Sequence, residues 1–304
     1  MKKKYDTSQL LNFVEGSYLE RTSRPVYALA FLLPFMVFYE LGTIFINVNL
    51  LRQYWQGRVV AFAWLQKFLE YLGFSSKLAW VAAPLTVVLI LIALQLASRK
   101  RWWVWIGDLG PMLLECILLA LPLIVFGLLL NTPAKSRPDT DQLARYSIRR
   151  QIPLAPTCTS TTDGGSAYVE DEGPTPGAAA KVLADIVTGI GAGIYEELVF
   201  RLILICLLML LFQDALRLNH NNAIILSVLV SAALFSAYHH IDFFSGRLFQ
   251  RNPFSWTEFG FRTLAGVYFA VLFAIRGFGI TAGAHAFYDV IATLINALFF
   301  HSGS

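Results

Sequence analysis

The sequence predicts an all-α membrane protein, a polytopic bundle of about seven transmembrane helices with one further interfacial or re-entrant segment. Of the 304 residues, 56% are hydrophobic and only 14% are charged, whereas a soluble domain carries roughly 25% charged residues. The mean hydropathy is +0.57, and apolar runs close to the ~20 residues that cross a bilayer recur along the chain. We therefore expect an integral, multi-pass protein whose first partner is the lipid bilayer.

Seven apolar segments define the predicted spans. The third contains Pro122, which membrane helices tolerate because neighbouring groups satisfy the freed backbone. The fourth is longer than one straight crossing needs, and its "GIGAG" stretch predicts a break or a tight packing point. The spans cover approximately residues 25–48, 78–97, 111–130, 182–212, 223–241, 261–276 and 280–300.

Two segments between the spans differ from them in composition. Residues 50–74 ("LLRQYWQGRVVAFAWLQKFLEYLGF") distribute charges through an aromatic-rich stretch, which is typical of an interfacial or re-entrant segment. Residues 131–180 are rich in Pro, Ser, Thr, Asp and Gly and predict a polar extramembrane loop. The chain is therefore predicted to comprise an N-terminal three-span region with the interfacial segment (1–130), this loop (131–180) and a four-span C-terminal core (181–304).

Positive charges near the span ends predict the orientation. If the spans alternate in direction, Lys2–Lys4, Arg21, Arg24 and the loop at Arg99–Arg101 fall on one side. The positive-inside rule makes that side cytoplasmic, so the N-terminus is expected in the cytoplasm. No basic tract reaches the density of a nucleic-acid-binding patch, and no nucleic-acid partner is expected.

Three charged residues interrupt the fourth span. The stretch "GAGIYEELVFR" contains Glu196, Glu197 and Arg201, and a charged residue at the centre of a membrane helix costs about 2.5–3.5 kcal/mol. Glu197 and Arg201 are four residues apart and can pair on one helix face. Glu196 points about 100° away, as a carboxylate directed into a cavity would. Taken alone, the three residues fit a structural salt bridge between helices equally well.

Ionisable residues also occur in the fifth and seventh spans. The fifth contains "FSAYHH", with Phe235 one turn before His239, and the seventh contains "HAFYD", with His285 and Asp289 one turn apart. Such groups compensate one another within a membrane only by converging, so we expect them to meet Glu196 around one pocket. A carboxylate and an imidazole can together activate water.

The same residue types can also bind a metal ion. Two imidazoles and a carboxylate are a common catalytic zinc shell that leaves one position open for water. The candidate ligands are Glu196, His239, His285 and Asp289. The residues therefore leave two mechanisms open, one with a divalent metal such as zinc and one with a metal-free glutamate.

These motifs resemble those of a known family. "EELVFR" resembles the EExxxR motif of the type II CAAX prenyl endopeptidases and their bacterial relatives, the CPBP intramembrane protease family. "FSAYH" resembles the family's FxxxH motif, and "HAFYD" resembles its HxxxN/D motif. The three occur in the family's order, over about residues 183–300. The resemblance implies an intramembrane endopeptidase that acts on a peptide or a membrane protein, with or without a lipid modification.

The resemblance also implies roles for the residues that match its motifs. Glu196 would be the general base that activates water, working with His239. His285 would stabilise the developing oxyanion or share in metal binding. The supporting residues that would hold this arrangement are Glu197, Arg201 and Phe235.

Asp289 departs from the pattern of the prenyl-substrate enzymes, which carry Asn at this position. An amide can donate a hydrogen bond to an oxyanion, whereas an ionised Asp cannot. The resemblance therefore implies that Asp289 belongs to the catalytic set in another capacity. It would orient His285, ligate a metal or stay protonated.

Two other functions use the same residues. A proton-coupled transporter could relay protons through the Glu, His and Asp side chains. The lack of an internal repeat and the confinement of these charges to the C-terminal half count against it. A non-catalytic membrane scaffold or immunity protein could dispense with costly buried charges, so the intact polar set favours the protease.

Overall fold

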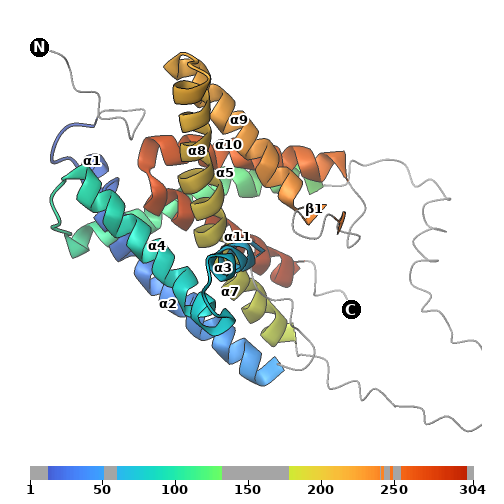
Figure 1. Cartoon of the computed structure of the whole chain (residues 1–304). Coiled ribbons are helices and arrows are strands. Elements are labelled where there is room, and N and C mark those ends of the chain that lie inside the picture. The colour runs from blue at the N-terminus through green and yellow to red at the C-terminus, as the bar shows by residue number, and fades with distance from the viewer. Residues whose placement is uncertain are drawn as a thin grey trace, which may run out of the picture. The chain divides into compact units, whose positions relative to one another are not determined.

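The computed structural model describes residues 13–50, 60–131, 178–239, 241–242, 247–248 and 255–299. The chain divides into a larger compact unit, residues 1–125 and 176–304, and a smaller one, residues 126–175. Nearly all of the predicted loop at 131–180 lies outside the described residues, so the division of the chain at that loop stays a prediction. The first three and the last four spans pack together in the larger unit (Figure 1).

The described residues are almost entirely helical, which confirms the predicted fold class. Seven stretches are long and apolar enough to cross a membrane. Two short strands, β1 (Ile241–Asp242) and β2 (Arg247–Leu248), pair antiparallel. The helices of the N-terminal part are α1 (Tyr18–Thr22), α2 (Pro25–Leu50), α3 (Val60–Tyr71), α4 (Ser76–Ser98), the 3₁₀ turn η1 (Ile106–Asp108) and α5 (Leu109–Asn131). Those of the C-terminal part are α7 (Ala178–Glu197), α8 (Ile205–Met209), α9 (His220–Tyr238), α10 (Trp256–Arg276) and α11 (Phe278–Phe299).

The fourth span is one long helical stretch, Ala179–Ala215, and contains two π-helical segments. The first, η2 (Leu198–Leu204), begins directly after the two glutamates, and the second is η3 (Leu210–Ala215). π-Helical turns are rare in proteins, and those that occur often lie at functional sites. The fourth span is thus longer than one straight crossing needs, as predicted, and it continues through both π-helical segments without a break.

The glycines of "GIGAG" form a tight packing point and not a break. A Cβ atom added at Gly193 would lie 2.5 Å from the backbone nitrogen of Ala286 in α11, and one at Gly189 would lie 2.7 Å from the Cβ of Asp289. Small residues let membrane helices approach closely. The close approach of α7 to α11 brings the EExxxR motif, which begins at Glu196, next to the HxxxD motif, which begins at His285.

We expect Gly193→Ala to destabilise the protein by about 1–3 kcal/mol, because the added methyl group overpacks the α7–α11 contact. The gain in helix propensity, about 1 kcal/mol, offsets part of this loss. The thermal unfolding temperature of the purified protein in detergent measures the effect. Gly260→Ala in α10 is the matched control, since its Cβ would meet nothing within 4 Å. Equal unfolding temperatures in the two variants would contradict the packing argument.

Helix α3 corresponds to the predicted interfacial or re-entrant segment. Its 12 residues are too few to cross a bilayer, which takes about 20, so the prediction that it is not a full span is confirmed. One face of α3 is buried against other helices. The Phe62 ring meets Tyr195 edge-on at 4.9 Å between centroids, and the Trp64 ring meets Tyr238 edge-on at 5.2 Å. α3 thus contacts α7 at Tyr195, the residue before Glu196, and α9 at Tyr238.

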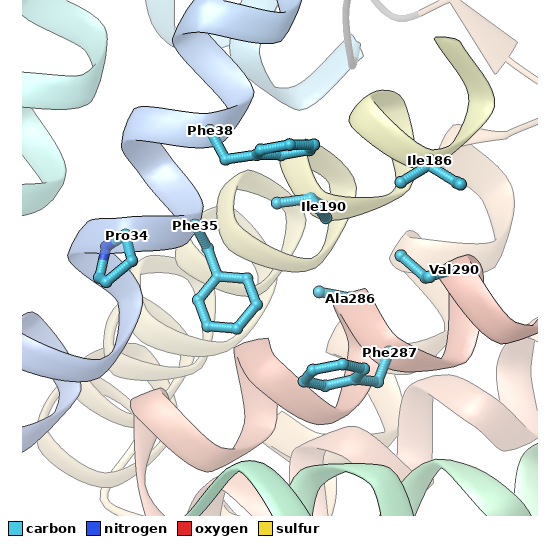
Figure 2. Close-up of a pocket in the computed structure, with 8 residues that line it drawn as sticks. All are labelled: Pro34, Phe35, Phe38, Ile186, Ile190, Ala286, Phe287 and Val290. Atoms are coloured by element: carbon cyan, nitrogen blue, oxygen red, sulfur yellow. The ribbon is translucent and has the colours of Figure 1, made fainter. Parts of the chain in front are cut away.

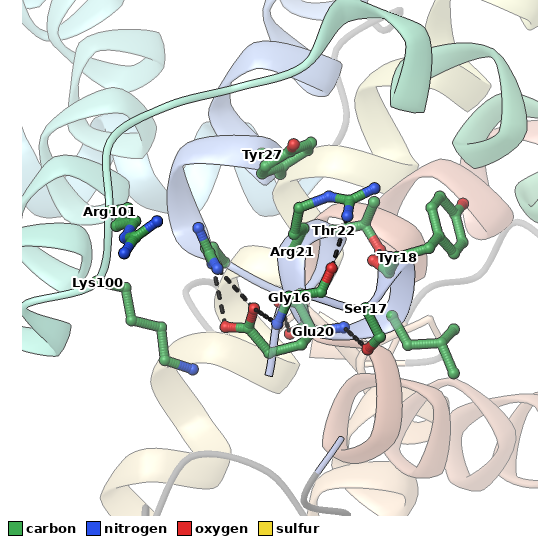
Figure 3. Close-up of polar contacts among 12 residues, drawn as sticks. Gly16, Ser17, Tyr18, Glu20, Arg21, Thr22, Tyr27, Lys100 and Arg101 are labelled. Atoms are coloured by element: carbon green, nitrogen blue, oxygen red, sulfur yellow. Dashed lines mark hydrogen bonds and ion pairs between the residues drawn. The ribbon is translucent and has the colours of Figure 1, made fainter. Parts of the chain in front are cut away.

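A polar network precedes the first span (Figure 3). The side chain of Ser17 caps α1 by accepting from the Glu20 amide, and Arg24 forms an ion pair with Glu20 at 2.5 Å. The hydrogen bonds from Arg24 hold the pKa of Glu20 below its usual range. Arg21 donates to Gly16 and to both carboxylate oxygens of Asp108. This network fixes α1 against the turn η1, which precedes α5. The cytoplasmic position of the N-terminus stays a prediction.

Candidate active site

The acid pair lies in the last turn of α7, where the helix enters its π-helical segment. Glu196 is 5% exposed and Glu197 is fully buried. Neighbouring residues of a helix point in directions about 100° apart, so the two carboxylates meet different partners. Glu197 faces Arg201 and α11, and Glu196 faces α9.

One carboxylate oxygen of Glu197 forms an ion pair with Arg201 and a hydrogen bond with His285. Its Oε1 lies 3.1 Å from Nη1 of Arg201 and 2.7 Å from Nδ1 of His285. The contact with Arg201 has the pairing that their spacing predicts. The contact with His285 was not anticipated from the sequence, because the two residues are 88 positions apart. A carboxylate only accepts hydrogen bonds, so Nδ1 of His285 carries the hydrogen.

The other nitrogen of His285 faces two further carboxylates. Nε2 lies 3.9 Å from Oε2 of Glu196 and 3.7 Å from Oδ2 of Asp289. Both separations are longer than a direct hydrogen bond. Asp289 retains 28% side-chain exposure, whereas His285 is buried. The hydrogen bond that orients the ring of His285 therefore runs from Nδ1 to Glu197. Asp289 lies near Nε2 without a direct hydrogen bond.

Arg201 is fully buried within η2. Its guanidinium lies 4.3 Å from the centroid of the Phe235 ring, and its Nη2 donates to the backbone oxygen of Gly266 at 3.3 Å. An arginine over an aromatic face gains a cation–π attraction that is largest when both groups are desolvated. The charge of Arg201 is thus compensated by Glu197, an aromatic face and a carbonyl dipole from α10.

Phe235 connects the three motifs through its ring. Besides Arg201, it contacts the rings of His239 and His285, with centroids 5.1 and 6.1 Å away. Phe269 of α10, which the sequence analysis did not single out, stacks on His285 at 4.6 Å with an interplanar angle of 16°. The imidazole of His285 is therefore fixed by a hydrogen bond at one edge and by aromatic rings around it.

His239 caps the C-terminus of α9. Its Nδ1 lies 2.9 Å from the backbone oxygen of Phe235, and its ring lies 4.3 Å from that of Tyr238. The hydroxyl of Tyr238 donates to Oε1 of Glu196 at 2.5 Å. Through Tyr238 the second motif forms a hydrogen bond with the first, in addition to the ring contact between Phe235 and Arg201. Its position beside His239 in "FSAYH" was visible in the sequence, but the direction of its hydroxyl was not.

The four predicted metal ligands are Glu196, His239, His285 and Asp289. Among the residues that the structure describes, no group of three or more His, Cys, Asp or Glu side chains is arranged to hold a metal. Nδ1 of His285 is bonded to Glu197, and its Nε2 lies 3.9 Å from Oε2 of Glu196 and 3.7 Å from Oδ2 of Asp289. A histidine that ligates a metal commonly bonds a carboxylate through its other nitrogen, so the bond to Glu197 leaves Nε2 available. A divalent metal such as zinc at these four residues therefore stays a prediction, as does the metal-free glutamate.

An apolar hollow of about 330 Å³ lies between α2, α7 and α11 (Figure 2). Every side chain that lines it is apolar. Ala286 and Phe287 directly follow His285 in α11, and Val290 directly follows Asp289. The remaining lining residues are Pro34, Phe35, Phe38, Ile186 and Ile190.

Comparison with protein families supports the resemblance that the motifs carry. The family model described as type II CAAX prenyl endopeptidase Rce1-like matches residues 178–291. This region contains all three motifs and confirms the resemblance over that part of the chain. Comparisons with curated proteins and with solved structures gave no match.

Proposed function

We propose that this chain is an intramembrane endopeptidase of the CAAX type, which hydrolyses a peptide bond with water activated by Glu196. One observation carries the proposal. The buried Glu196 lies within reach of groups from two other spans, with Tyr238 of α9 bonded to one carboxylate oxygen and His285 of α11 near the other. Buried ionisable groups on membrane helices cost free energy, and where they occur they usually mark a functional site.

The geometry suits activation of a single water molecule. Oε2 of Glu196 and Nε2 of His285 are 3.9 Å apart, and one water about 2.8 Å from each atom would bridge them. Glu196 takes a proton from this water as the hydroxide oxygen attacks the peptide carbonyl carbon. The carbon–nitrogen bond of the tetrahedral intermediate then breaks, and the proton held by Glu196 passes to the leaving amine. Water is consumed, and a carboxylate and an amine are released.

The two histidines have different parts in this proposed reaction. Glu197 holds the ring of His285 through Nδ1, which leaves Nε2 to face the reacting atoms. When Nε2 carries a proton, it stabilises the oxyanion by donating a hydrogen bond to it. His239 stands next to Tyr238 at the end of α9 and assists Glu196 in handling protons. Asp289, 3.7 Å from Nε2 of His285, is the second carboxylate beside the reacting atoms.

The substrate class that we propose is a peptide or membrane protein with a lipid modification. The family match to prenyl endopeptidases supports this class. The apolar hollow between α2, α7 and α11 shares helix α11 with His285 and Asp289 (Figure 2). A hydrocarbon chain would meet only apolar side chains there. The hollow would therefore suit the lipid chain while the peptide reaches the carboxylates.

The proposal is tested by incubating the purified protein, in detergent, with a farnesylated peptide that ends in a CAAX sequence and with its unmodified counterpart. We expect cleavage at the modified peptide, measured by mass spectrometry, and a loss of about 100-fold or more in His239→Ala, since acid–base groups contribute at least that factor. His220→Ala is the matched control, because His220 is exposed at the start of α9 and bonds Gln213. Undiminished cleavage by His239→Ala would refute this role. Proton-driven uptake in liposomes without any cleavage would favour a transporter.

A further inference from the structure

Tyr238 has no role in the proposed reaction, although it makes the shortest contact to the proposed base. Its side chain is buried and its hydroxyl donates to Oε1 of Glu196. A hydrogen bond to an ionised carboxylate is stronger and more directional than one between neutral groups. One oxygen of Glu196 is therefore occupied and fixed in direction.

The occupied oxygen determines which one can act on water. With Oε1 held by Tyr238, the other oxygen, Oε2, is the one that lies nearest to Nε2 of His285. A glutamate has three rotatable side-chain bonds, and its terminal torsion is broad when nothing restrains it. Without the hydroxyl, the carboxylate would distribute over several orientations, of which only some point Oε2 toward His285.

The ring of Tyr238 is itself held from several sides. It contacts Phe200 of η2 at 5.1 Å and Trp64 of α3 at 5.2 Å between ring centroids. Phe235 and His239, both in the second motif, contact it at 6.2 and 4.3 Å. A catalytic group stays aligned only when the residues that hold it are themselves locked by packing. Trp64 lies outside the region that matches the family model, so part of this support comes from the N-terminal half of the chain.

We propose that Tyr238 is a positioning residue, which holds Oε1 of Glu196 so that Oε2 takes the proton from water. The inference rests on the proposed endopeptidase function and adds a determinant to it. Tyr238 acts through Glu196 and forms no bond with the substrate. Its hydroxyl is therefore needed for turnover and not for substrate binding.

Steady-state kinetics of Tyr238→Phe on the farnesylated peptide test this role. We expect kcat to fall about 10- to 100-fold, because the base loses a charge-assisted hydrogen bond and its fixed orientation. KM should stay within about twofold of the wild-type value, since uniform binding is unchanged. The matched control is Tyr268→Phe, which removes a hydroxyl of a partly buried tyrosine that donates to the backbone oxygen of Leu119 at 2.7 Å. That variant loses a comparable hydrogen bond away from Glu196 and should keep its kcat.

The outcomes separate this inference from the proposed function. Wild-type cleavage together with an unchanged kcat in Tyr238→Phe would overturn the positioning role and leave the endopeptidase standing. A raised KM at constant kcat, or an equal loss of kcat in both tyrosine variants, would also overturn it. Absence of cleavage by the wild type would remove the proposed function and this inference with it. The thermal unfolding temperature of each variant shows that the comparison is made between folded proteins.

Discussion

Glu196→Gln is expected to lower kcat on a cleavable peptide by about 1,000-fold or more while leaving the protein inserted and folded. General-base catalysis contributes roughly 10²–10⁴-fold, and an amide cannot accept the proton that the carboxylate takes from water. Gln has nearly the same shape, and its carbonyl oxygen can still accept from Tyr238, which now donates to Oε1 of Glu196. The loss should therefore appear in turnover and not in stability.

Glu258→Gln provides the control for the Glu196 variant. Glu258 lies in the first turn of α10 with its side chain 49% exposed, so the same chemical change occurs there at the protein surface. Single-turnover rates, size-exclusion profiles and unfolding temperatures should be measured on both variants. Full activity in Glu196→Gln would show that another group activates the water and would remove the central assignment of the mechanism.

The sequence could predict the features that depend on local pattern. Hydropathy located the seven spans because a bilayer requires about 20 apolar residues in succession. The contact between Glu197 and Arg201 followed from a four-residue spacing on one helix face, and the structure has it at 3.1 Å. The motifs identified Phe235 and His285 as candidates, and both lie within the cluster around Arg201 and Glu197.

The contacts between helices could not be predicted in this way. Their partners depend on the rotation and depth of each helix, which the close packing of Gly189 and Gly193 against α11 sets here. The bond from His285 to Glu197 and the bond from Tyr238 to Glu196 both cross between helices. A helix periodicity gives the face on which a side chain lies, but not the residue opposite. For the same reason, residue types alone do not decide between a metal centre and a metal-free glutamate.

The fully buried charge of Arg201 makes a second strong prediction, which concerns stability. Arg201→Met should destabilise the protein by about 3–5 kcal/mol, because it leaves the charge of Glu197 buried without its cationic partner. The remaining bond of Glu197, to His285, does not replace a permanent positive charge. Denaturant titration of the purified protein in mixed micelles measures the loss. Arg262→Met is the control, since Arg262 forms a partly exposed pair with Glu258 at 3.7 Å and such pairs contribute about 0–1 kcal/mol.

A double variant separates the charge of this pair from its packing. Replacing both partners of a buried ion pair by neutral side chains of similar volume is often close to neutral for stability. Glu197→Gln combined with Arg201→Met should therefore recover most of the stability that Arg201→Met loses. Its kcat should nevertheless stay low, because the ring of His285 would lose the charged acceptor that now lies 2.7 Å from Nδ1. If Arg201→Met alone were as stable as the wild type, or if the double variant were less stable than that single one, the pair would not carry the compensating charge that its burial demands.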